Sequence, residues 1–149
     1  MAPEPVVADA LQQTLVDLIS LELQSKQAHW NIRGARFRAL HLALDEVVDA
    51  AREQADTVAE RLAQIGGIPD GRVTAVSQTS SLEEIDYGLL EVDKTYQLMA
   101  EKVQEVSDRI KSVIEPVDEK CHVSGDILIA AAETLDKQAW LLRSATEGA

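Results

Sequence analysis

The chain has 149 residues, the length of one domain with a sizeable core, and few of them are aromatic (3%), Gly or Pro, so the composition favours an all-helical fold over a sheet. Its single cysteine, Cys121, excludes an intrachain disulfide, and the absence of an export signal or a long apolar run predicts a cytoplasmic protein outside the membrane. The formal net charge of -12 disfavours contact with phosphate backbones and favours cations.

Apolar residues that recur every three or four positions predict two long helices in the first half of the chain. The first helix is expected over residues 6–31 and ends near Gly34. The second is expected over 36–65 and ends at Gly66-Gly67, shortly before Pro69. Glycine and proline in these positions are strong signals for the end of a helix.

The same periodicity predicts two long helices in the second half. One is expected over residues 91–115, closed by Pro116, and the other over 123–144. Stacking of the four apolar stripes predicts one four-helix bundle domain over 1–149, with short non-basic tails at 1–5 and 145–149.

The connection between the second and third helices is too long for an ordinary bundle loop. Ser80 with Glu83, or Ser81 with Glu84, fits a capping box, which predicts a short extra helix or an early start of the third helix. A connection of this length also allows the chain to cross the bundle, so that the second and third helices run parallel.

Two pairs of potential metal ligands lie on the second helix. His41 and Asp45 are four residues apart, as are Asp56 and Glu60, so each pair projects from one face of the helix. Asp45 and Asp56 are separated by about 16 Å of axial rise. The two pairs therefore cannot share an ion within one straight helix.

Both pairs are symmetric about the Ala50-Ala51 step. Two antiparallel copies of the helix, related by a two-fold axis there, would place His41 opposite the partner's Glu60 and Asp45 opposite the partner's Asp56. Small alanines at the crossing allow a close approach. The spacing thus predicts an isologous dimer with two equivalent metal sites.

The competing interpretation is that these residues are ordinary solvated charges, which is the more common arrangement for charge alone. A mixed set of imidazoles and carboxylates, however, suits Fe, Mn or Zn. His29 precedes His41 by twelve residues and, taken alone, is more often a structural histidine or a helix C-cap. Trp30 is more often a packing residue, although an indole beside a redox metal could intercept one-electron oxidants.

A second constellation lies near the start of the last helix. Glu119 and His122 have the Glu-x-x-His spacing of di-iron bundles, with Cys121 and Asp126 close by, but those sites need two such pairs and the chain has one. The alternatives are a solvated helix start, where Asp118 and Glu119 favour the positive end of the dipole, or an acidic route for cations.

The segment KQAHWNIRGARFRALHLALDEVVDAAREQADTVAERLAQIGGIPDG resembles the signature of the Dps family, the mini-ferritins named as DNA-binding proteins from starved cells. The matching features are His29-Trp30-Asn31, Gly34, Phe37, Leu40-His41, Asp45-Glu46, Asp56, Ala59-Glu60-Arg61, Gly66-Gly67 and Pro69, followed later by Asp126, Leu128, Asp136-Lys137 and Trp140. The resemblance implies a ferritin-like four-helix subunit with a short helix between the second and third, assembled as a hollow homododecamer.

The resemblance also implies a ferroxidase, in which ferrous iron is oxidised between subunits, usually by hydrogen peroxide, and ferric oxide is stored inside. Three ligands, His29, His41 and Asp45, would come from one subunit, and Asp56 and Glu60 from its two-fold mate. Such a reaction would both store iron and protect against oxidative damage.

Three acidic residues, Asp118, Glu119 and Asp126, are expected to line a pore that draws in Fe²⁺, although His122 and Cys121 are not expected pore chemistry.

The tails depart from those of family members that bind DNA directly. No basic residue precedes Lys26 and none follows Arg143, which with the acidic charge predicts weak or no direct DNA binding. Two alternatives stay open: a DNA-compacting structural protein, which the tails disfavour, and a metal-dependent hydrolase using the same site, for which the sequence shows no nucleophile motif.

Overall fold

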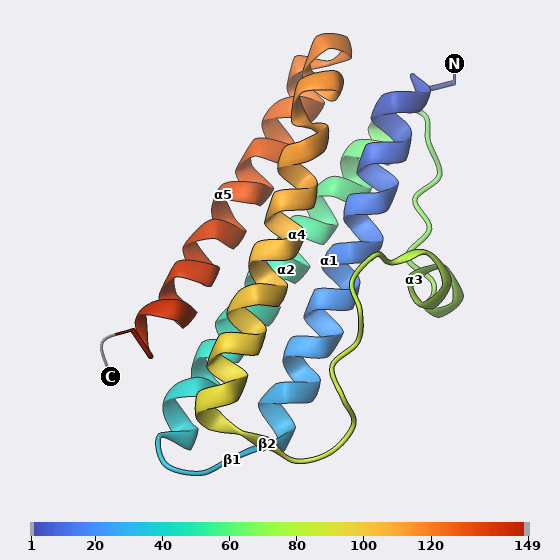
Figure 1. Cartoon of the computed structure of the whole chain (residues 1–149). Helices are drawn as coiled ribbons and strands as arrows, with labels where there is room; N and C mark the ends of the chain where they lie inside the picture. Colours follow the sequence, from blue (N-terminus) through green and yellow to red (C-terminus); the bar gives the residue numbers. More distant parts are fainter. Residues whose placement is uncertain (1, 148–149) are drawn as a thin grey trace.

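The computed structural model describes residues 2–147, and this part of the chain forms five helices and a minimal two-stranded sheet (Figure 1). In chain order the elements are α1 (Pro5–Asn31), β1 (Ile32–Arg33), α2 (Phe37–Gln64), α3 (Val73–Thr79), β2 (Leu90–Glu91), α4 (Val92–Lys120) and α5 (His122–Ser144). The all-helical prediction is confirmed, including the short extra helix in the long connection.

The four long helices form two antiparallel hairpins, α1 with α2 and α4 with α5, packed side by side (Figure 1). β1, just before α2, pairs in parallel with β2, just before α4, with Ile32 opposite Leu90. Because α2 and α4 start from this shared ladder, they run in the same direction. The connection between them therefore returns along the length of the bundle, as the sequence allowed.

The core lies where the apolar stripes of the four long helices meet, because residues three and four apart share a helix face. Its largest fully buried side chains include Leu11, Leu18, Leu21, Leu40, Leu44, Met99, Ile110, Leu128, Leu135 and Leu142. Within residues 2–147, no helix combines the length and apolarity required to cross a bilayer.

The third long helix does not stop at Pro116, as the sequence rule predicts, but continues to Lys120. A proline inside a helix removes one backbone hydrogen bond. Val117, directly after it, is fully buried in the core, and its carbonyl accepts the Cys121 amide at 2.8 Å. Burial of Val117 outweighs the lost hydrogen bond, so the prediction of a stop at Pro116 is wrong.

The short helix lies earlier than the capping-box serines suggest. α3 ends at Thr79, and Ser80 and Ser81 follow it instead of starting a helix. Their side chains bind Asp17 of α1, which is only 2% exposed: its carboxylate accepts the Ser80 hydroxyl at 3.0 Å and the Ser81 hydroxyl and amide at 2.7 Å each. The two serines therefore bind Asp17 and do not cap a helix. These hydrogen bonds attach the connection between α2 and α4 to α1.

Candidate metal centre

The turn between α1 and α2 brings His29 and His41 into contact. Gly34 in this turn has φ 126°, a conformation that favours glycine, and the pairing of β1 with β2 fixes its position. The two imidazole rings stack with centroids 3.5 Å apart and an interplanar angle of 15°. His29 is buried in the last turn of α1, whereas His41 is half-buried near the start of α2.

Each imidazole is tied to the backbone of the other histidine. The Nδ1 atom of His29 lies 2.6 Å from the His41 carbonyl oxygen, and the Nδ1 atom of His41 lies 2.9 Å from the His29 carbonyl oxygen. Because a carbonyl only accepts, both Nδ1 atoms must donate, and each neutral ring then keeps its lone pair on Nε2. The His41 bond also satisfies a carbonyl in the last turn of α1, where helical acceptors lack amide partners. In this tautomer Nε2 is the ring atom of each histidine that could bind a cation.

Asp45 lies beside the two rings, one turn after His41. Its Oδ1 atom is 3.6 Å from Nδ1 of His29 and accepts a hydrogen bond from the Lys26 ammonium at 2.6 Å. The Lys26 hydrogen bond, followed by the charges of the nearby groups, holds the pKa of Asp45 below its usual 3.8 even though burial pulls that pKa upward. A carboxylate therefore faces the imidazoles with a cation already attached.

Lys26 is the residue of this site that the sequence did not single out. It precedes His29 by three residues, so helical spacing places both side chains on one face of α1. A basic residue on the same face as a potential metal ligand is therefore visible in the sequence. Trp30, the next residue after His29, is 66% exposed, so it is not part of the core formed by residues 2–147.

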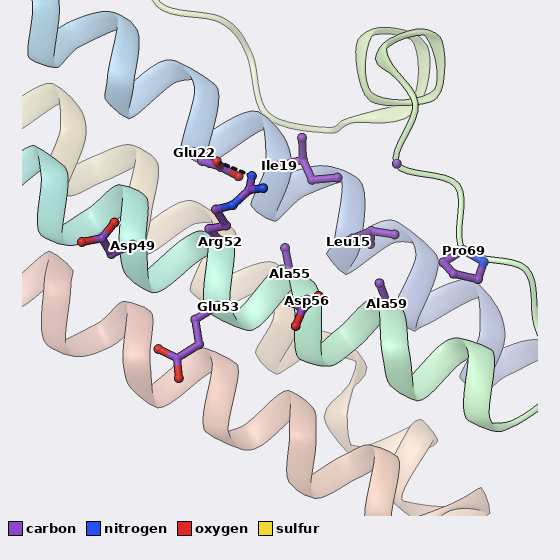
Figure 2. A pocket seen from close by; sticks show the side chains of 11 residues that line it. Leu15, Ile19, Glu22, Asp49, Arg52, Glu53, Ala55, Asp56, Ala59 and Pro69 are labelled. Carbon is purple, nitrogen blue, oxygen red and sulfur yellow. Dashed lines mark hydrogen bonds and ion pairs between the residues drawn. The ribbon is translucent and has the colours of Figure 1, made fainter.

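Asp56 and Glu60 lie apart from the histidines on the exposed surface of α2. Neither carboxylate has a hydrogen bond or ion pair with any residue of the described range 2–147. Asp56 lines a groove of about 650 Å³ between α1 and α2, across which Arg52 and Glu22 form an ion pair at 3.0 Å (Figure 2). This groove presents Asp56 at the molecular surface.

No three His, Cys, Asp or Glu side chains among residues 2–147 converge closely enough to hold a metal ion. The structure brings His29 into contact with both His41 and Asp45, and it leaves Asp56 and Glu60 separate from them. Completion of the site by a second subunit stays a prediction from the symmetric spacing.

The turn between α4 and α5 holds the second constellation. His122 pairs with Asp118 at 3.0 Å, not with Glu119, and this contact raises the pKa of the imidazole. Hydrogen bonds from Ser124, with Arg61 3.2 Å from the sulfur, lower the pKa of the Cys121 thiol to about 7.

The residues predicted to line a pore share this end of the bundle. Glu119 and Asp126 are exposed, and Asp118 is half-buried beside the first turn of α5. Three acidic side chains are thus available on this surface, and their role in a pore stays a prediction.

Known proteins resemble this chain over almost its whole length. Residues 8–148 match the family model described as a ferritin-like domain. The DNA protection during starvation protein of Agrobacterium fabrum is 34% identical over 139 residues, which cover 93% of this chain and 86% of that protein.

Solved structures agree with these matches. The crystal structure of Dps92 from Deinococcus radiodurans is 30% identical and superposes with a TM-score of 0.93, covering 97% of this chain and 87% of that one. A structure of Dps from Microbacterium arborescens, described as being in the high iron form, is 31% identical with a TM-score of 0.83 and covers 95% of both chains. The chain therefore belongs to the Dps family within the ferritin-like superfamily.

Proposed function

We propose that this protein is an iron-oxidising and iron-storing mini-ferritin. Its substrates are Fe²⁺ and hydrogen peroxide, and its product is ferric oxide held in a hollow shell of twelve subunits. The observation that carries the proposal is the stacked pair His29 and His41, whose Nδ1 atoms are both occupied by backbone carbonyls. In a Dps chain, two imidazoles fixed in this way beside Asp45 form one half of an iron site.

The second half comes from the two-fold partner in this proposal. Asp56 and Glu60 are exposed and without polar partners among residues 2–147, and they mirror Asp45 and His41 about the Ala50-Ala51 step. An antiparallel α2 pair would place these carboxylates opposite the imidazoles. Each dimer would then hold two equivalent sites.

The mixed ligand set suits the proposed reaction. Imidazole nitrogens bind Fe²⁺, and carboxylates stabilise the higher charge of Fe³⁺. Two Fe²⁺ ions each give one electron to a hydrogen peroxide molecule, whose O–O bond breaks, and two protons complete two water molecules. Where two Fe²⁺ ions occupy one site together, the peroxide takes both electrons there, so that no hydroxyl radical would be released and the ferric product would pass to the store.

Two further observations support an iron-storing role. The Microbacterium arborescens relative has a structure described as the high iron form. The net charge of -12 attracts cations to this chain. We assign to Asp118, Glu119 and Asp126 the role of guiding Fe²⁺ through a pore at the turn between α4 and α5.

Relatives carry the name DNA protection during starvation protein. For this chain we propose that such protection is chemical, through removal of iron and peroxide, because a net charge of -12 opposes binding to a phosphate backbone. A gel shift that showed tight retention of duplex DNA at physiological salt would contradict this part of the proposal.

The proposal is tested by anaerobic titration with Fe²⁺ followed by addition of peroxide, monitored by absorbance, together with a mass measurement of the assembly. The wild-type protein should oxidise Fe²⁺ rapidly as a dodecamer. His41→Ala and Asp56→Asn should lose rapid oxidation while keeping the assembly mass. Glu101→Gln, an exposed carboxylate on α4 outside the proposed α2 interface, serves as the control and should react normally. A His41/Asp56 double variant that oxidises Fe²⁺ at full speed would refute the site.

A further inference from the structure

Phe37 begins α2 and has a position that core packing does not explain. The apolar periodicity of the second helix includes it, yet its side chain is 39% exposed and lies outside the buried cluster formed by Leu40, Leu44 and the rest of the core. Its stacked aromatic partner is a metal-ligand candidate, His41.

The Phe37 ring stacks on the imidazole of His41, one helical turn further along. The ring centroids are 4.9 Å apart with an interplanar angle of 26°, which is the range of favourable stacked aromatic pairs. The His29 ring lies closer still, with its centroid 3.5 Å from that of His41. His41 therefore stacks with one ring from α1 and with another from its own helix, α2.

These stacked contacts and one hydrogen bond restrict the orientation of the His41 ring. Two rings contact it, and its Nδ1 donates to the His29 carbonyl oxygen at 2.9 Å. With Nδ1 occupied in this way, Nε2 is the ring nitrogen left to bind a cation.

We propose that Phe37 is a positioning residue for His41, fixing the plane of the imidazole so that Nε2 points to the incoming cation before that cation arrives. This inference rests on the proposed iron site and assigns a role to a side chain that does not itself touch the metal. Its loss should let the His41 ring turn about its side-chain torsions and should weaken the first binding event, without abolishing it.

The test is titration of the assembled, iron-free protein with Co²⁺, followed through the visible absorption of the bound ion. Phe37→Leu keeps apolar volume but removes the ring, Phe37→Met does the same with an unbranched chain, and Phe37→Tyr keeps the ring. Loss of a stacked aromatic contact should raise the Kd of Co²⁺ by about 2- to 12-fold and alter the absorption spectrum. Phe37→Tyr should restore the wild-type Kd and spectrum.

The outcomes separate this inference from the proposed function. Wild-type protein that binds no Co²⁺ would overturn the metal site itself. Wild-type protein that binds Co²⁺, with Phe37→Leu and Phe37→Met giving the same Kd and spectrum, would overturn only the role of Phe37. A weaker Kd in both ring-free variants with an unchanged assembly mass, restored by Phe37→Tyr, is the expected result.

Discussion

Replacing Lys26 with methionine should make the protein bind divalent cations more tightly. In the metal-free chain the Lys26 ammonium lies 2.6 Å from Asp45 Oδ1, so an arriving cation must displace a cation already present. Methionine has a similar length without the charge. The carboxylate would then be free, and the local positive charge that repels a metal ion would be gone.

The size of the effect follows from the exposure of the pair. The two side chains are 35% and 39% exposed, so breaking this ion pair costs only about 0.2–1 kcal/mol. Repulsion between the ammonium and a divalent cation about 5 Å away adds about 1.7 kcal/mol in water, before salt screening reduces it. A net gain of about 1–2 kcal/mol corresponds to binding that is about 5- to 30-fold tighter.

Isothermal titration calorimetry with Co²⁺ at neutral pH measures this change directly. Lys26→Arg keeps the charge and should bind Co²⁺ about as the wild type does. An unchanged or weaker affinity in Lys26→Met would refute the competition and would mean that Lys26 holds Asp45 in a useful orientation instead.

Three other properties should respond to single changes. Leu44 is fully buried, so Leu44→Ala should lower the free energy of unfolding by about 2–5 kcal/mol in denaturant titrations, and a loss below about 0.5 kcal/mol would contradict the core assignment. Burial pulls the pKa of Asp136 upward, but hydrogen bonds led by Lys111 outweigh it and hold the pKa below the usual 3.8. The stability from this carboxylate is therefore present above pH 3.8 and lost as the pH falls through the folded pKa. Asp136→Asn should have a lower free energy of unfolding than wild type at pH 7, and this difference should narrow at low pH. A difference that does not change with pH would be inconsistent with the lowered pKa. Iodoacetamide should alkylate Cys121 with a midpoint near pH 7, and Ser124→Ala should move that midpoint upward, whereas a wild-type midpoint near pH 9 would exclude the lowered pKa.

The long helices were predictable because several local signals agree in each. The first was expected over 6–31 and runs over Pro5–Asn31, and the second was expected over 36–65 and runs over Phe37–Gln64. In both helices, apolar residues recur every three or four positions, and a glycine follows where this pattern ends. Such agreement leaves little for tertiary packing to change.

The errors occurred where a tertiary contact overrides a local rule. Pro116 predicts the end of a helix, but α4 continues past it because Val117 is buried in the core. Ser80 and Ser81 have capping chemistry, but the buried carboxylate of Asp17 binds them after α3 has ended. Neither contact has a signature in the neighbouring sequence.

The candidate site was predictable in part for the same reason. Helical spacing alone places His41 next to Asp45, and the turn at Gly34 returns His29 to them. Helical spacing also places Phe37 one turn before His41, and Lys26 on the same face of α1 as His29. The Lys26 contact with Asp45 depends on the packing of α1 against α2, and the stacking of Phe37 on His41 depends on ring orientation, and sequence spacing does not encode these two details.

The central claim, that two subunits share each metal site, is tested most directly by mixing two inactive variants. His41→Ala and Glu60→Ala subunits are co-assembled in equal amounts, and Fe²⁺ oxidation by peroxide is compared with that of each variant alone. A mixed dimer carries both defects in one site and keeps the other site intact, so random pairing should restore about one quarter of the wild-type sites. Recovery of about that fraction is predicted, and a mixture no more active than its separate components would contradict the shared site.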